Sequence, residues 1–147
     1  MKSDPLITFR RKPADIDRDA LEAFAQDLKE RVAAGREFCC LISNDGHLRE
    51  LNREFRAKDV PTDVLSFPSG EPAGYLGDIA VSLQRARAQA KEFGHHVETE
   101  IRILLLHGLL HLNGMDHEAD RGEMAETERR WRLELGLPAS LIERAER

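Results

Sequence analysis

Four short segments of the chain alternate or concentrate apolar residues in the manner of β-strands. They are "PLITFR" (5–10), "EFCCLIS" (37–43), the proline-bracketed run "VPTDVLSFP" (60–68) and "DIAVSL" (78–83). Successive side chains of a strand point to opposite faces of a sheet, so a half-buried strand shows alternation and a fully buried one a continuous apolar run. The pattern therefore predicts a small sheet of about four strands.

The segments between the first three strands have the apolar spacing of amphipathic helices. Residues 15–35 predict one helix, with Asp15 or Asp17 as its N-cap and Gly35 as its stop. Residues 44–59 predict a second helix. Its inner face is expected to carry Leu48, Leu51 and Phe55.

Two further helices are expected at 83–94 and 97–114. Residues 121–146 are expected to form one helix followed by a shorter one. Residues 97–114 are apolar almost all round and predict a buried central helix. The order βαβαββααα favours a mixed α/β (α+β) fold, a small sheet with helices packed on it. No repeat, low-complexity segment or linker divides the chain, so 1–147 is expected to be one domain.

Composition narrows the class of protein further. Charged residues make up 33% of the 147 and are interspersed, and the net charge of −5 argues weakly against a general nucleic-acid binder. No apolar run is long enough for a signal sequence or a membrane span. Cys39 and Cys40 are adjacent and do not form a disulfide framework; they are expected inside a buried strand. A cytoplasmic protein without a membrane partner is expected.

Three histidines stand out in "LLLHGLLHLNGMDHE" (104–118). His107 and His111 are four residues apart on the expected central helix, about 40° apart on one face, so both rings can reach one ion. Gly114 provides a helix stop, after which the chain can turn back and deliver His117. Three imidazoles leave one tetrahedral position of Zn²⁺ open, as in catalytic sites. Asp116 and Glu118 are candidates to accept an imidazole N–H.

The same spacing, H-x-x-x-H-x-x-G-x-x-H, matches the metzincin protease signature at each ligand and at the glycine. That signature has a glutamate, the general base, directly after the first histidine. Here the residue is Gly108. The usual zinc-peptidase mechanism is therefore disfavoured unless another carboxylate replaces the missing base.

Together, "HGLLHLNGMDH" (107–117), "NREFRAKDVPTDVLSFP" (52–68) and "GDIAVS" (77–82) resemble the YbeY family of bacterial endoribonucleases over about residues 38–136. The resemblance implies a single-strand-specific enzyme of rRNA (16S 3′ end) maturation and ribosome quality control. It implies the small ribosomal subunit and an Era-type GTPase as partners. It also implies His107, His111 and His117 as metal ligands and Arg56 as the cleft arginine. Thr62, Asp63, Ser66 and Asp78 match the family pattern with less defined roles.

Two arginine-rich segments independently favour a phosphate substrate, because guanidinium groups match phosphate oxygens geometrically. Arg49, Arg53 and Arg56 recur on one expected helix, and Arg85, Arg87 and Lys91 on another. Glu50 and Glu54 interleave with the first set, so a plain solvated face stays open as the alternative for Arg49 and Arg53.

These residues predict metal-assisted cleavage of RNA phosphodiesters, with Arg56 stabilising the negative charge of the transition state. Zn²⁺ is expected from three imidazole ligands, although Ni²⁺, Co²⁺ or Fe²⁺ could bind the same set. The attacking group is open between metal-bound hydroxide and the ribose 2′-OH. Asp63, Asp78 and Ser66 are the candidates for a general base.

Two other classes of function remain open. One is a zinc-dependent metallopeptidase-like hydrolase, against which the missing glutamate counts. The other is a non-catalytic, zinc-containing ribosome-assembly factor with a structural metal. A fourth protein ligand, Asp116 or Glu118, would favour that factor, since structural zinc sites are normally closed by four ligands.

Overall fold

Four strands form one mixed sheet in the computed structural model, which describes residues 4–11, 13–71, 73–139 and 141–145. They are β1 (Ile7–Phe9), β2 (Phe38–Ser43), β3 (Val64–Pro68) and β4 (Gly77–Ser82). The order across the sheet is β1-β2-β4-β3. The first three strands in that order are parallel, and β3 runs antiparallel to β4 with Ser66 opposite Ile79. The expected mixed sheet is confirmed.

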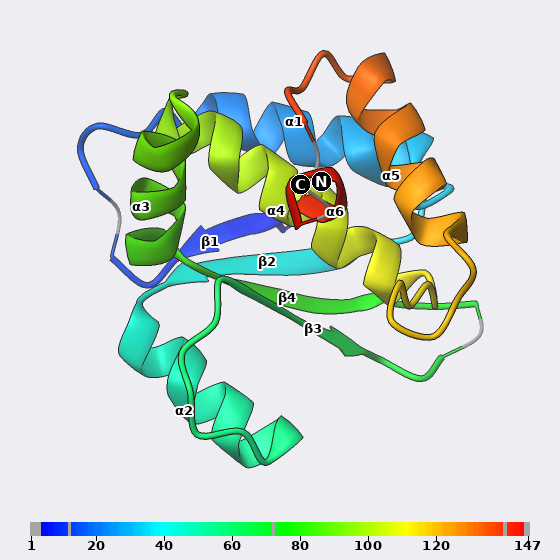
Figure 1. Cartoon of the computed structure of the whole chain (residues 1–147), viewed down its shortest axis with the longest axis horizontal. Coiled ribbons are helices and arrows are strands. Elements are labelled where there is room, and N and C mark those ends of the chain that lie inside the picture. The colour runs from blue at the N-terminus through cyan, green and yellow to red at the C-terminus, as the bar shows by residue number, and fades with distance from the viewer. Residues whose placement is uncertain (1–3, 12, 72, 140, 146–147) are drawn as a thin grey trace.

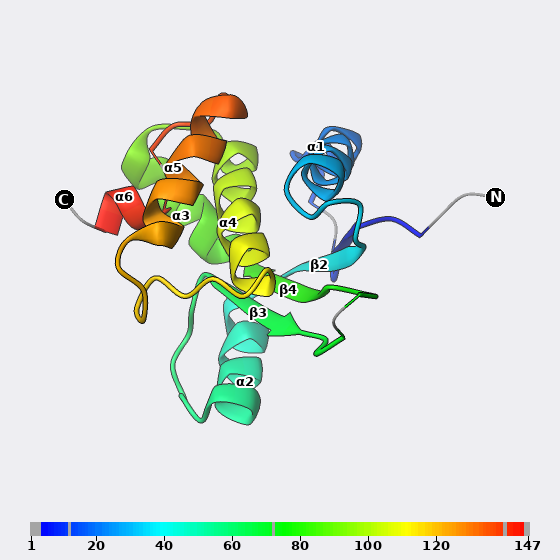
Figure 2. The same cartoon turned by 90° about the vertical axis from the view of Figure 1, so that its right-hand side faces the viewer.

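Helices cover the two faces of the sheet unequally (Figures 1 and 2). One face carries α1 (Arg18–Arg31), α3 (Leu83–Phe93), α4 (Val97–Leu112), α5 (Glu123–Glu134) and α6 (Leu141–Ala145). Of the described helices, α2 (Asp45–Arg56) is the one on the opposite face, packed on β3 and β4. The elements follow the order βαβαββααα with one further helix at the end, α6, which is the shorter helix expected in 121–146.

Short polar side chains start the helices that follow strands. Asp17 accepts from the backbone N–H of Ala20 at 3.0 Å, and Ser82 accepts from that of Arg85 at 3.2 Å. Each contact satisfies a backbone donor that the first helical turn leaves without a partner. Helix α1 ends four residues earlier than the predicted stop, at Arg31, and the left-handed backbone of Gly35 (φ 83°) follows it.

The central helix α4 is the core element that positions the site. Eleven of its 16 residues are buried, which confirms the predicted central helix. It lies so close to the sheet that a Cβ on Gly108 would be 3.0 Å from Ile79 Cγ2 and 3.3 Å from Val64 Cγ2. The Ser66 hydroxyl donates to the Gly108 carbonyl at 2.8 Å. A glycine at this position therefore allows α4 to dock directly on β3 and β4.

One predicted core residue is not in the core. Leu48 of α2 is fully buried, but the side chain of Phe55 is 65% exposed, so its expected place on the inner face is wrong. Helix α2 runs away from the sheet toward its C-terminal end, as Figures 1 and 2 show. Its last turn is therefore not packed flat on the sheet, and the Phe55 ring touches it through an edge-on contact with Phe67 of β3, with centroids 5.4 Å apart.

Within the described residues, none of the helices is long and apolar enough to cross a lipid bilayer.

Candidate metal and active site

The three predicted ligands converge at the C-terminal end of α4. Their ligand nitrogens all lie within 4.8 Å of one another, and this is the one such group found among the described residues. His107 is buried, His111 is half-buried and His117 is exposed. The helix stops at Asn113, and Gly114 adopts a left-handed backbone (φ 91°) that turns the chain back toward His117. The grouping of the three histidines and the turn at Gly114 are both as predicted.

Acceptors outside the cluster fix the orientation of two of the rings. His107 Nδ1 lies 2.7 Å from an oxygen of Glu128, a buried residue of α5. His111 Nδ1 lies 2.9 Å from the backbone carbonyl of Met115. Since a carboxylate and a carbonyl can only accept, each Nδ1 carries the proton and each Nε2 keeps a lone pair.

The two Nε2 atoms face each other at 3.2 Å, so this donor set fits a metal ion. Two lone pairs at that distance repel unless a proton or a cation lies between them. Burial lowers the pKa of His111, and a positive charge on His107 would lower it further, so a second proton on the His111 ring is disfavoured. The neutral rings with Nε2 pointing inward are the form that binds divalent metals.

Two aspartates organise the loop that carries His117 by accepting from backbone N–H groups, and neither forms a hydrogen bond with an imidazole among the described residues. Asp116 Oδ1 accepts from the backbone N–H of Glu118 at 3.0 Å. Asp120 accepts from the backbone N–H groups of Gly122 and Met124, which lower the pKa of its carboxyl. The predicted contacts of Asp116 and Glu118 with imidazoles are replaced by Glu128 and the Met115 carbonyl. Neither Asp116 nor Glu118 joins the ligand group.

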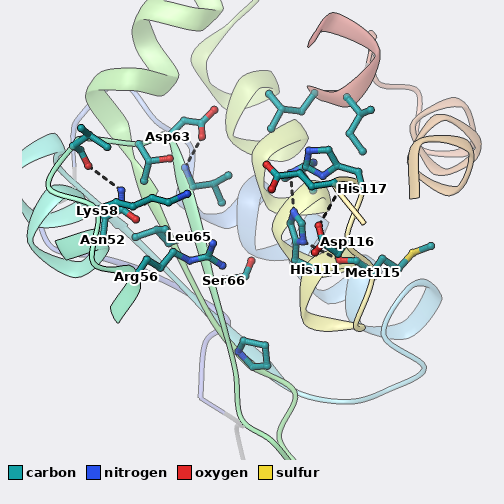
Figure 3. A pocket seen from close by; sticks show the side chains of 18 of the residues that line it. Asn52, Arg56, Lys58, Asp63, Leu65, Ser66, His111, Met115, Asp116 and His117 are labelled. Carbon is teal, nitrogen blue, oxygen red and sulfur yellow. Dashed lines mark hydrogen bonds between the residues drawn. The ribbon is translucent and has the colours of Figure 1, made fainter. Parts of the chain in front are cut away.

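A pocket of about 660 Å³ opens in front of the histidines. Arg56 and Lys58 reach in from one side, His111 and His117 lie on the other, and Ser66 lies between them (Figure 3). Neither cationic side chain has a hydrogen-bond or ion-pair partner among the described residues. A cationic wall thus faces the cluster of nitrogen ligands.

The other two predicted catalytic residues line the same pocket but make contacts that hold the fold. Ser66 is buried, and its hydroxyl proton goes to the Gly108 carbonyl. The carboxylate of Asp63 accepts from its neighbour Val64 at 2.8 Å and from the Gln89 side chain at 3.1 Å. These contacts attach β3 to α4 and α3. A catalytic role for either residue stays a prediction.

The four arginines predicted to bind substrate do not line the pocket. Arg49 pairs with Asp59 at 2.8 Å, Arg85 with Asp45 at 3.2 Å and Arg87 with Asp15 at 2.7 Å. Arg53 is exposed on α2. Because three of these guanidinium groups already have carboxylate partners, their role in substrate binding stays a prediction.

Sequence reasoning missed two side chains of the candidate site. Lys58 stands two residues after Arg56 in the same block, a signal that was available. Glu128 is 21 residues from His107 in an ordinary amphipathic helix and gave no signal.

Comparison with known proteins places this site in a family. A family model described as "Endoribonuclease YbeY" matches residues 6–136, which include the histidines, Arg56 and Lys58. The chain belongs to the YbeY family. The family model begins at residue 6, whereas the resemblance seen in the sequence began at about residue 38.

Individual relatives agree with the YbeY family model. An "Endoribonuclease YbeY" from Solibacter usitatus is 61% identical over 140 residues, 95% of this chain and 94% of that protein. One from Koribacter versatilis is 44% identical over 139 residues, 95% of this chain and 91% of that protein. The solution structure of TM1509 from Thermotoga maritima has 31% identity and a TM-score of 0.58, and 85% of each chain is covered. YbeY membership supports a nuclease, a hydrolase of phosphodiester bonds.

Proposed function

We propose that this protein is a metal-dependent endoribonuclease that cleaves single-stranded RNA and acts in rRNA (16S 3′ end) maturation and ribosome quality control. One observation carries the proposal. In a chain of the YbeY family, three imidazoles with inward-facing nitrogens lie across one pocket from Arg56 and Lys58.

The residues divide the chemistry between the two walls of the pocket. His107, His111 and His117 would hold the ion, and Zn²⁺ is proposed from the three nitrogen ligands. A bound ion of this kind supplies Lewis-acid polarisation of a phosphate oxygen and a lowered pKa for water. The Arg56 fork donates hydrogen bonds to non-bridging phosphate oxygens and stabilises the charge that grows on them. Lys58 adds a point charge on the same side.

The remaining parts of the proposal rest on the family resemblance. Preference for single strands, the rRNA substrate, and the small ribosomal subunit and an Era-type GTPase as partners come from it. Cleavage of precursor 16S rRNA within small ribosomal subunits, compared with the same RNA free of protein, tests whether ribosomal partners are required.

The two rival functions fit the site less well. A peptidase of the metzincin type needs a carboxylate after the first histidine, but position 108 is packed against Ile79 and Val64 of the sheet and is not among the residues that line the pocket. A structural metal site needs a closed set of ligands, whereas the described group has three.

The test compares wild type with His111→Ala and Arg56→Ala on single-stranded RNA, on the same RNA annealed to its complement, and on an unfolded protein. Arg129→Ala, which removes an exposed arginine of α5, is the matched control. His111→Ala should lose metal and RNA cleavage together. Arg56→Ala should keep its metal and lose about 10²–10³-fold in kcat.

Three results would argue against the proposal. RNA cleavage that survives in metal-free His111→Ala would reveal a contaminating nuclease. Full activity of Arg56→Ala would remove the arginine from the mechanism. Hydrolysis of the unfolded protein by wild type, lost in His111→Ala, would favour the peptidase.

A further inference from the structure

A second hollow continues from the pocket in front of the histidines. It is a groove of about 970 Å³ on the α2 side of the sheet, the side that α2 covers only in part. Arg56, Ser66 and Pro68 line both the groove and the pocket. The pocket and the groove therefore form one continuous surface. A long molecule bound at the histidines can pass Arg56 and extend into the groove.

Aromatic rings mark the groove next to this junction. Phe55, which directly precedes Arg56, is 65% exposed, and its ring packs edge-on against Phe67, with centroids 5.4 Å apart. We call this pair the Phe55 platform. Leu41, Leu51 and Ala80 extend the apolar surface from it. A phenylalanine left this open forgoes the free energy that burial of its ring would provide. Phe67 supports the edge of the Phe55 ring and leaves most of the ring free to receive a flat partner.

Charge and shape together indicate which partner fits. Arg56 and Lys58 offer cationic groups to a phosphate, and the Phe55 platform offers an aromatic surface beside them. Proteins bind single-stranded nucleic acid with this combination, a cationic track for the backbone and aromatic side chains on which bases stack. An apolar protein segment would use the platform but not the two unpaired cations.

We propose that the Phe55 platform stacks a nucleobase of the RNA strand, next to the phosphate that Arg56 contacts. The inference rests on the proposed ribonuclease function and deepens it. In a duplex each base already stacks on its neighbours and its paired edge is occupied, so only an unpaired base can be splayed onto the ring. The platform thus gives a physical reason for a preference for single strands.

The test is a cycle of protein and substrate changes. Short single-stranded RNAs carry one abasic ribose at successive positions around the cleavage site. They are compared with intact RNA for kcat/KM and for equilibrium binding, with wild type, Phe55→Ala and Phe55→Trp. Leu133→Ala is the matched control, because it removes another side chain that is 64% exposed, on a helix of the opposite face. Metal content and thermal unfolding are measured on every variant.

At one substrate position the abasic ribose should cost wild type about 5- to 150-fold, the range for loss of one stacked base. Phe55→Ala should show the same loss on intact RNA and no further loss on that abasic RNA. Phe55→Trp, which keeps an aromatic surface, should restore the difference between intact and abasic RNA that Phe55→Ala abolishes, and Leu133→Ala should behave as wild type. This non-additivity separates stacking from a general weakening of the site.

Other outcomes overturn the platform or the enzyme separately. Unchanged binding and cleavage in Phe55→Ala would overturn the platform and leave the groove to a protein partner. A loss in Phe55→Ala that simply adds to the abasic effect would overturn it as well, since the two changes would act independently. Phe55-dependent binding of RNA that wild type never cleaves would support the platform and refute the proposed ribonuclease.

Discussion

Replacing Glu128 by glutamine tests the outer contacts of the metal site with a change of almost no volume. The two carboxylate oxygens of Glu128 accept from different donors. One takes the Nδ1–H of His107 at 2.7 Å, and the other takes the backbone N–H of Ile142 in α6 at 2.9 Å. A glutamine amide has one oxygen and one NH₂ group, so it cannot accept at both places. One of the two contacts must change.

The contact to His107 is the one expected to change, because a neutral imidazole can move its proton whereas a backbone N–H cannot. Glutamine would keep its oxygen on Ile142 and donate to His107 Nδ1. The proton of the ring then lies on Nε2, the atom that faces His111 at 3.2 Å. Loss of such an orienting partner typically costs about 10- to 100-fold in metal affinity, which corresponds to about 1.4–2.7 kcal/mol.

The assay is competition for Zn²⁺ between the protein and a chromophoric chelator, with hydrogen exchange of the Ile142 amide as a second readout. Glu126→Gln, the same change at an exposed position of α5, is the control and should bind Zn²⁺ as wild type does. If the glutamine turns the other way, Zn²⁺ affinity is kept and the Ile142 amide exchanges faster. Wild-type affinity together with wild-type protection of Ile142 would refute the reasoning.

Three further predictions follow from the same contacts. The lowered pKa of His111 means that the unfolded chain takes up a proton near pH 6.5 while the metal-free folded chain takes it up only at lower pH. The free energy of unfolding of the metal-free protein should therefore fall as the pH drops through 6.5, and less steeply in His111→Gln, as denaturant titrations from about pH 8 to about pH 5 would show. Gly108→Glu introduces the metzincin-type base into the sequence. It should lower the free energy of unfolding by about 3 kcal/mol or more, because it buries a charge against the sheet, and it should give no peptidase activity. A stable variant that hydrolyses protein would contradict this prediction. Burial raises the pKa of the fully buried Cys40 thiol, so iodoacetamide should leave Cys40 of the native protein unmodified at neutral pH and modify it after denaturation, as peptide mass spectrometry would show.

The parts of the site that sequence predicted are those that depend on local geometry. The four-residue spacing of His107 and His111 puts both rings on one face of any helix, and Gly114 permits the turn that returns His117. The strands and helices were predictable for the same reason, since their apolar periods are local. Phe55 was placed wrongly because periodicity gives the face of a helix and not its tilt from the sheet.

The parts that sequence could not provide depend on contacts between distant segments. Arg85 and Arg87 were predicted to bind substrate because they cluster with Lys91 on one helix, but in the fold Asp45 and Asp15 form ion pairs with them. Arg56 and Lys58 differ in that neither forms an ion pair with any of the residues that the structure describes. A basic residue is available to a substrate when the fold leaves its charge unpaired, and the order of residues does not show which charges those are.

Helix α4 also explains why a histidine spacing shared with proteases serves a different reaction here. His107 and His111 face the pocket, while the intervening Gly108 lies against the sheet, where its lack of a side chain allows the close approach of β3 and β4. The helix therefore provides ligands and no base, so further chemistry must come from the opposite wall. That wall offers Arg56 and Lys58, which are cations, while the Asp63 carboxylate in the same pocket already accepts from Val64 and Gln89. Peptide hydrolysis needs a group that removes a proton from water, whereas phosphodiester cleavage gains most from groups that stabilise negative charge on phosphate oxygens. The close packing of one helix on the sheet thus favours a nuclease over a peptidase at this site.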